Sequence, residues 1–159
     1  MTLFGKRSKY PVFYTLLMSL VVLLSANVSA SQSRVALVIG NGDYRSAPLK
    51  NPVNDAVSMS RTLSSLGFRV IEGKNLSRKQ MRAKIREFGK AIKSADVGLF
   101  YFAGHGMQYD GGNYLIPVSA NIEAEDEIID EAIDASSVLR KMETAGIATN
   151  IVILDACRN

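Results

Sequence analysis

The chain of 159 residues contains one cysteine, one histidine and no tryptophan. A single cysteine excludes a disulfide within the chain and every zinc site that is built on several cysteines. A single histidine excludes any site that needs two imidazoles. Side-chain chemistry in this protein therefore uses at most one thiol and one imidazole.

Acidic residues are absent from the first 30 residues, which carry Lys6, Arg7 and Lys9. An apolar run over residues 12–24 follows, and small residues lead up to Ala30. This layout predicts a secretory signal peptide, residues 1–30, cleaved after Ala30, and an exported, periplasmic or secreted domain over residues 31–159. The alternative is an uncleaved membrane anchor, although the run is shorter than the roughly 20 residues that span a bilayer. We expect membrane contact only through this segment.

The basic excess belongs mainly to that first segment. The whole chain has 19 basic and 15 acidic residues and a net charge of +4, and three of the basic residues lie in the first 30. The remainder is therefore close to neutral, and it carries no basic stripe interleaved with aromatic residues. We expect no nucleic-acid partner.

Apolar runs and helical periodicities alternate along the rest of the chain. Continuous apolar runs indicate buried strands, and apolar residues at spacings of three and four indicate helices. The expected strands are 35–39, 68–71, 97–103 and 150–155; the expected helices are 52–66, 77–92 and 136–145; a hairpin is expected within 107–118. This order predicts an α/β fold, a three-layer sandwich with a mostly parallel sheet and helices on both faces.

Two charged stretches lie outside the expected core. The helix over residues 77–92 buries a stripe that begins at Met81, and residues 78–93 carry seven basic residues on the other faces. We interpret these as a solvated face, and the alternative is a docking surface for an acidic partner. Residues 123–134 carry seven acidic residues and are expected to be exposed. Calcium binding is the alternative there, but the spacing does not match an EF-hand loop, so we assign no metal site and no cofactor.

The lone histidine and the lone cysteine each directly follow an expected strand. His105 follows the third strand and Cys157 the fourth, so both side chains reach the same edge of the sheet if these strands are neighbours. An imidazole can take the proton of a thiol and so generate a nucleophilic thiolate. Gly104 and Gly106 would leave the histidine loop open, and the amides of Gly106 and Cys157 could donate to an oxyanion. Taken separately, a lone cysteine or histidine is more often structural.

Four segments carry a resemblance to a known family: VALVIGNGDY (35–44), LKNPVNDA (49–56), YFAGHG (101–106) and LDACRN (154–159). Residues 34–159 resemble the large catalytic subunit of the caspase-like cysteine peptidases, which include caspases, metacaspases and bacterial orthocaspases. The resemblance implies a caspase-like α/β sandwich of the bacterial exported type. It also implies a peptide-bond hydrolase with His105 as general base and Cys157 as nucleophile, acting on a peptide or protein substrate.

The chain departs from the caspase pattern in two ways. Caspases have glutamine two positions before the cysteine, whereas this chain has Asp155, as metacaspases do. Metacaspases cut after arginine or lysine, and Asp55 is a candidate second acid for the same pocket, since a carboxylate pairs with a guanidinium. The alternative for Asp55 is a helix-start residue. Family members also continue beyond the cysteine, either in the same chain or in a second subunit. We therefore expect the C-terminal part of the sheet to be missing and the last strand to have a free edge.

Two other functions compete with peptide hydrolysis. A caspase-like fold without catalysis would act as an interaction module, or the chain would be an inactive fragment. Gly40, Asn41 and Gly42 also begin a nucleotide-binding fingerprint, but that fingerprint requires glycine at position 45, where Arg45 stands.

Overall fold

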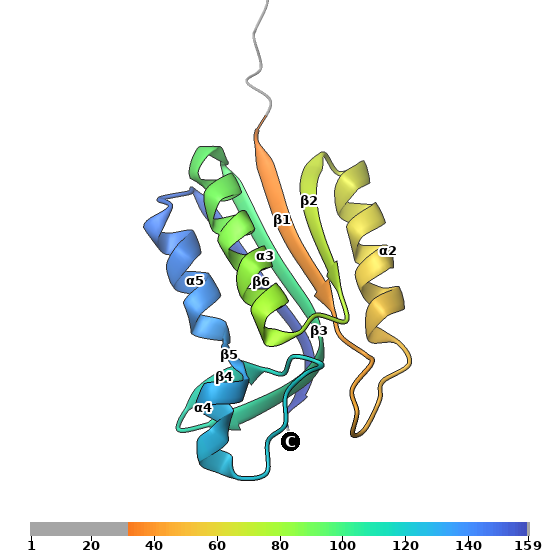
Figure 1. Ribbon diagram of the computed structural model, residues 1–159. Helices are drawn as coiled ribbons and strands as arrows, with labels where there is room; N and C mark the ends of the chain where they lie inside the picture. Colours follow the sequence, from red (N-terminus) through yellow and green to blue (C-terminus); the bar gives the residue numbers. More distant parts are fainter. Residues whose placement is uncertain (1–31, 159) are drawn as a thin grey trace, which may run out of the picture. The chain divides into compact units, whose positions relative to one another are not determined.

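The computed structural model describes residues 32–158, which fold as a sheet with helices on both faces (Figure 1). In chain order the main elements are β1 (Arg34–Gly40), α2 (Pro52–Ser65), β2 (Phe68–Lys74), α3 (Arg78–Ala91), β3 (Val97–Tyr109), β4 (Gly112–Leu115), α4 (Ile128–Glu131), β5 (Ile133–Asp134), α5 (Ala135–Thr144) and β6 (Thr149–Arg158). Short 3-10 turns, η1 (Ile92–Ser94) and η2 (Glu125–Glu127), follow α3 and precede α4. The expected signal segment lies outside the described residues.

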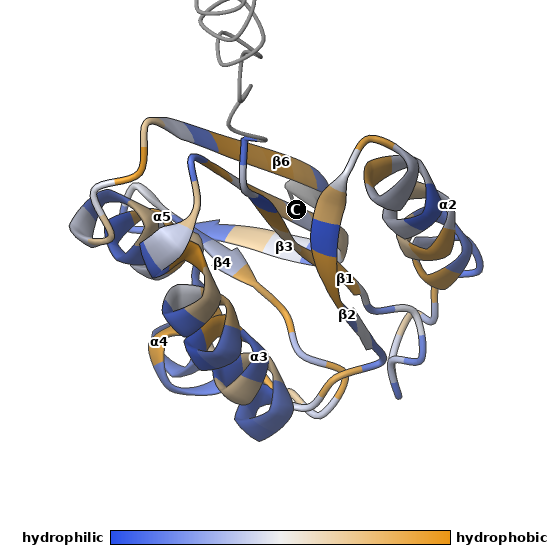
Figure 2. Ribbon diagram, turned by 90° about the horizontal axis from the view of Figure 1, so that it is seen from above, coloured by the Kyte–Doolittle hydropathy of each residue, from blue (hydrophilic) through white to orange (hydrophobic). Residues whose placement is uncertain are grey.

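The sheet confirms the expected mostly parallel α/β topology. Its main path is β2-β1-β3-β4-β5, and β6 pairs with β3. The pairs β1–β2, β1–β3 and β3–β6 are parallel, whereas β3–β4 and β4–β5 are antiparallel. Viewed from above, α2 lies on one face of the sheet and α3 and α5 lie on the other, which gives three layers (Figure 2).

The strand β1 has apolar side chains on both faces because both faces are covered by helices. Val35, Leu37 and Ile39 belong to the core on the side of α3 and α5, and Ala36 and Val38 belong to the core on the side of α2. Alternate residues of a strand point to opposite faces, so an unbroken apolar run can fill two cores at once.

Helix ends form where the sequence predicts them. Pro52 occupies the first turn of α2, where its missing N–H costs nothing. Ser77 and Gln80 form a capping box at the start of α3. The predicted stripe of α3 and η1 is buried: Met81, Ile85, Phe88 and Ile92. The α3 helix therefore exposes only its charged faces.

Two predicted strand ends were wrong. The third strand was expected to end at Ala103, but β3 continues through His105 to Tyr109, because its last residues pair with β4 in a hairpin. The fourth strand was expected to end at Asp155, but β6 continues to Arg158. Gly104, His105 and Gly106 are thus part of a strand and do not form an open loop.

The acidic segment 123–134 is only partly exposed. Its carboxylates face solvent to varying degrees, but Ile128, Ala132 and Ile133 are buried. Ile128 and Ala132 pack in a small apolar cluster with Tyr44 and Ile116. The prediction of an exposed segment was wrong for these three apolar residues, because it relied on the many acidic residues that surround them in the sequence. Within residues 32–158, no helix is both long and apolar enough to cross a bilayer.

Candidate active site at the carboxyl ends of β3 and β6

His105 and Cys157 are in register on neighbouring parallel strands, as the sequence predicts. The pairing of β3 with β6 sets Ala103 opposite Asp155, His105 opposite Cys157, and Gly106 opposite Arg158. Adjacent strands lie about 4.8 Å apart, so the two backbones are as close as the sheet allows. The two residues lie within their strands and not just beyond them.

The imidazole of His105 is oriented by a backbone carbonyl. Its Nε2 lies 2.7 Å from the oxygen of Ala47. A carbonyl oxygen can only accept a hydrogen bond, so Nε2 carries the proton in the neutral ring. The other nitrogen, Nδ1, is then the one that can accept a proton.

Tyr44 packs against the histidine and holds its backbone. The two rings have centroids 4.5 Å apart and are tilted by 55°. The Tyr44 hydroxyl accepts the N–H of His105 at 3.0 Å and donates to the carbonyl of Ile116 at 3.1 Å. Burial raises the pKa of Tyr44 to about 12, against the lowering effect of hydrogen bonds with His105 and Asn41. The phenol therefore stays protonated and able to donate.

The loop that carries Tyr44 and Ala47 is fixed by two asparagines. Asn75 accepts the amides of Gly42 and Asp43 through its side-chain oxygen, at 2.9 and 3.1 Å. Asn41 is fully buried, and its side chain accepts the amide of Leu76 at 2.9 Å and donates to the carbonyl of Ile116 at 3.3 Å. These bonds tie residues 41–43 to the end of β2 and to the residues after β4, and they anchor the wall that Tyr44 forms beside His105.

The same bonds argue against the nucleotide-binding alternative. The amides of four consecutive residues each donate to an acceptor within the protein: Asn41, Gly42, Asp43 and Tyr44. A phosphate cradle needs backbone amides that are free to bind the ligand. The glycines at 40 and 42 instead permit close packing, because a Cβ at Gly40 would lie 2.3 Å from the carbonyl oxygen of Pro52.

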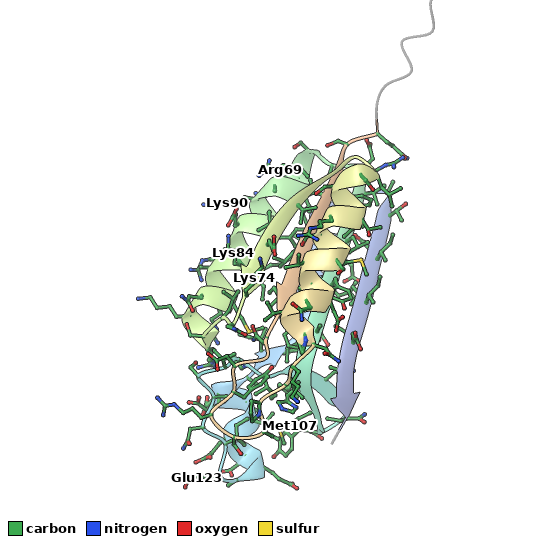
Figure 3. The ribbon with its side chains drawn as sticks, turned by 90° about the vertical axis from the view of Figure 1, so that its right-hand side faces the viewer. Arg69, Lys74, Lys84, Lys90, Met107 and Glu123 are labelled. Carbon is green, nitrogen blue, oxygen red and sulfur yellow. The ribbon has the colours of Figure 1, made fainter. Side chains whose placement is uncertain are left out.

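A cavity of about 290 Å³ opens beside the histidine. Its wall includes His105, Gly106 and the Tyr44 loop, and its apolar residues are Ala47, Met107, Ile116, Val118, Ala120 and Ile122. Figure 3 shows Met107 near the lower end of the molecule, below the ends of α2 and α3. The cavity can hold one apolar side chain of a bound peptide.

The two acids singled out in the sequence act on the same tyrosine. The hydroxyl of Tyr101 donates to Oδ2 of Asp155 at 3.2 Å. Burial raises the pKa of Tyr101 to about 12, with further contributions from the Asp155 carboxylate and from the charge of Asp55. Both acids are exposed, whereas Tyr101 is buried on the α2 face of the sheet. Asp155 lies on β6, next to the strand of Tyr101, and Asp55 lies in the first turn of α2, the helix that covers the same face as Tyr101.

Gly106 lies between two strands. It is in register with Leu115 of β4 on one side and Arg158 of β6 on the other, and it lines the cavity beside His105. Over residues 32–158, no group of three or more histidine, cysteine, aspartate or glutamate side chains is arranged to hold a metal ion.

Sequence reasoning missed the residues that position the histidine and the acids. Tyr44, Tyr101 and Asn41 each lie within a motif that carries the family resemblance, yet none was given a role. A polar residue directly after a buried strand, as Asn41 is, was the available signal. The carbonyl of Ala47 has no sequence signal, because any residue supplies a carbonyl.

Comparisons with known proteins identify the family of the chain. The family model described as caspase domain matches residues 33–159. The human mucosa-associated lymphoid tissue lymphoma translocation protein 1 is 32% identical over 129 residues, which is 80% of this chain and 15% of that protein. Its mouse homologue is 30% identical over the same shares. The chain thus spans about a seventh of the length of these relatives.

A solved structure shares the fold. The Drosophila initiator caspase Dronc superimposes with a TM-score of 0.58 at 14% identity, covering 77% of this chain and 50% of that one. The chain belongs to the caspase domain family of cysteine peptidases.

Proposed function

We propose that this chain is the catalytic part of a cysteine endopeptidase that cuts peptide bonds after arginine or lysine. The observation that carries the proposal is the register of β3 with β6, which sets His105 beside Cys157. The bond from Nε2 of His105 to the Ala47 carbonyl supports it further, because it leaves Nδ1 as the base.

The reaction then follows from ordinary thiol chemistry. Nδ1 of His105 takes the proton of Cys157, and the thiolate attacks the carbonyl carbon of the scissile bond. The amides of Gly106 and Cys157 are the proposed donors to the oxyanion. The imidazolium gives its proton to the departing amine, and water hydrolyses the acyl-enzyme.

The preference for basic residues is proposed from the two carboxylates. Asp155 lies two residues before the nucleophile, and the charge of Asp55 contributes with that of Asp155 to the raised pKa of Tyr101. A guanidinium binds a carboxylate through two parallel hydrogen bonds, and a second negative charge strengthens the attraction. The residue on the acyl side of the cut would place its cation here.

The catalytic roles are tested with the natural full-length protein and a fluorogenic peptide that ends in arginine. Cys157→Ala and His105→Ala should each lower kcat/KM by at least about a thousandfold. Ser94→Ala, an exposed position on another part of the molecule, serves as the control and should keep full activity. Equal cleavage by wild type and the Cys157 variant would rule out the proposal.

The acid pair is tested separately by its effect on substrate choice. Asp55→Asn and Asp155→Asn should each lower kcat/KM for the arginine peptide by roughly 10- to 100-fold and leave cleavage of a matched neutral peptide, however slow, nearly unchanged. Asp110→Asn is the matched control, because it removes an exposed carboxylate in the β3–β4 turn. A parallel loss on both peptides would contradict the specificity role.

An interaction module without catalysis is the second candidate, and the free edge of β6 favours it. Within residues 32–158, β6 pairs only with β3, and Val152, Ile153 and Leu154 are 38–39% exposed. Such an edge pairs readily with another strand, from a continuation or second subunit of the protein or from a partner. Partner capture that survives the double change Cys157→Ala with His105→Ala, together with no detectable cleavage, would favour this function.

Export is proposed from the first 30 residues alone, through the signal segment that ends at Ala30. The measurement is the N-terminal sequence and mass of the protein recovered outside the cytoplasm. A mature chain that begins at Ser31 agrees with export and cleavage, and an intact Met1 in the cytoplasmic fraction contradicts it.

A further inference from the structure

A basic groove runs between α3 and α5, on the face of the sheet opposite α2 and the proposed acid pair. Two adjoining hollows of about 830 and 520 Å³ form it, and they share four lining residues: Arg86, Ser137, Arg140 and Lys141. We call this surface the α3–α5 groove. Figure 3 shows Lys84 and Lys90 along the outer side of α3, turned away from the sheet.

The charge of the groove is largely unneutralised. Six cationic side chains line it: Arg82, Arg86, Lys90, Lys93, Arg140 and Lys141. Asp134 is the one acid in the lining, and it pairs with Arg140 at 2.9 Å. Among residues 32–156, no carboxylate lies within 4 Å of the other five cations. Like charges held this close repel one another, so a bound anion would relieve the repulsion.

The packing of the two helices keeps the cations together. Gly89 of α3 faces Lys141 of α5, and a Cβ at position 89 would lie 3.4 Å from Cδ of that lysine. The absence of a side chain therefore lets the lysine stem lie against α3, and Lys141 lines the same hollow as Arg86 and Lys90. Stems of this kind cover apolar surface while their charges stay in water.

One end of the groove is apolar. Ile85, Tyr114, Ile129 and Ile133 contribute to the second hollow, and Ile129 is 56% exposed. A ligand that fits both parts carries several negative charges and also apolar side chains, which is the chemistry of an acidic amphipathic peptide. Nucleic acid fits less well, because Tyr114 is the one aromatic residue of the lining and offers no row of stacking surfaces.

We propose that the α3–α5 groove binds an acidic segment of a partner protein that carries apolar side chains between its carboxylates. The groove lies away from His105 and the carboxylate pair, so this binding is independent of the proposed peptidase activity. A partner held there would keep the substrate edge of the sheet free.

The test is a binding measurement on the full chain by fluorescence anisotropy. The probe is a labelled synthetic peptide with the sequence of residues 121–134, which interleaves seven carboxylates with isoleucine and alanine. Binding should be weakened at least about tenfold by the double change Arg86→Glu with Lys141→Glu, since both cations line both hollows. The matched control, Lys50→Glu with Arg61→Glu, makes the same change of charge at exposed positions near and on α2 and should alter affinity less than about twofold.

Two further probes separate the proposal from general attraction between charges. The same peptide with every carboxylate replaced by its amide should not bind, and a labelled 15-nucleotide single-stranded DNA should bind more weakly than the acidic peptide. Tighter binding of DNA, or equal weakening by both double variants, would overturn the proposal. Loss of binding in Ile129→Ser at unchanged charge would support the apolar contact, and unaltered binding there would refute it.

Discussion

The two strands that carry the proposed catalytic pair differ in how the protein supports them. Along one side β3 pairs first with β1 and then with β4, and along its other side it pairs with β6. The first eight residues of β3 are all buried. β6 pairs only with β3 within the described residues, and three consecutive apolar residues of it remain more than a third exposed. The histidine half of the site is therefore held by this chain alone, whereas the cysteine half depends on a strand with one free edge.

The largest difference in stability between the two strands should come from two residues that are paired across β3 and β6. Phe102 is fully buried on β3, and its partner on β6, Leu154, is 39% exposed. Phe102→Ala should lower the free energy of unfolding by about 3–5 kcal/mol. Leu154→Ala should cost about 1 kcal/mol or less, because part of its surface is already in water. Urea denaturation measures both values, and equal costs would refute the difference between the strands.

A second comparison uses two glycines. A Cβ at Gly104 of β3 would lie 2.6 Å from the Tyr44 hydroxyl and 2.9 Å from the Phe102 ring, whereas a Cβ at Gly67 meets nothing within 4 Å. Gly104→Ala should cost about 2–3 kcal/mol, through overpacking beside the histidine and through backbone strain at its φ of +156°. Gly67 has a φ of +81°, so Gly67→Ala should cost only about 1 kcal/mol from backbone strain. A larger loss of stability for Gly67→Ala than for Gly104→Ala would show that Tyr44 moves to accommodate the added methyl group.

Tyr44 offers a test of positioning within the histidine half. Tyr44→Phe removes the hydroxyl that accepts the His105 amide and leaves the Ile116 carbonyl with one partner fewer. The free energy of unfolding should fall by about 1–2 kcal/mol. If the hydroxyl also positions the imidazole through the backbone of His105, kcat should fall while KM stays the same, and its pH profile should shift. Unchanged kcat with lower stability would leave Tyr44 a purely structural role.

The free edge of β6 predicts an effect on association and not on folding. Ile153→Lys places a charge on the strand, and charged residues are a common protection of exposed edges. Sedimentation velocity should show less self-association than in wild type, with the urea midpoint nearly unchanged. The matched change on a covered strand, Val38→Lys, should prevent folding, because that side chain is fully buried.

The same contrast explains what the sequence could predict. Buried strands such as β1, the capping box at Ser77 and the stripe of α3 follow from local periodicity, and all three are present. The pairing of His105 with Cys157 followed from two residues at the carboxyl ends of parallel strands. The C-terminal ends of β3 and β6 could not be predicted in this way. They are set by the pairing of β3 with β4 and with β6, and the pairing of β3 with β6 joins residues far apart in the sequence.

The candidate site shows a similar division. Residue types with distinctive chemistry, the thiol, the imidazole and the two carboxylates, could be named from the sequence. Their supports could not, because the Ala47 carbonyl, the Tyr44 hydroxyl and the Asn75 side chain act through loop geometry. Two apolar residues in the acidic stretch, Ile128 and Ala132, were missed for a related reason, since their partner Tyr44 is more than 80 residues away.

The smallest effect concerns Tyr101, which links the two strands through its bond to Asp155. Its pKa is raised to about 12 in the folded protein, whereas an unfolded tyrosine titrates near about 10. Below pH 10 both states hold the proton, so its contribution to stability is fully present. Between about pH 10 and 12 the unfolded state releases the proton first, so stability falls as pH rises.

Tyr101→Phe should therefore make the decline of the urea midpoint between pH 10 and 11.5 less steep than in wild type. Tyr44, whose pKa is also about 12, provides the remaining decline and serves as the internal reference. At pH 7 the Tyr101 variant should lose only about 1 kcal/mol, because Asp155 is exposed and water replaces the lost partner. An unchanged slope would mean that the phenol of Tyr101 titrates normally, and the link between β3 and β6 at Asp155 would then be too loose to hold the acid pair in place.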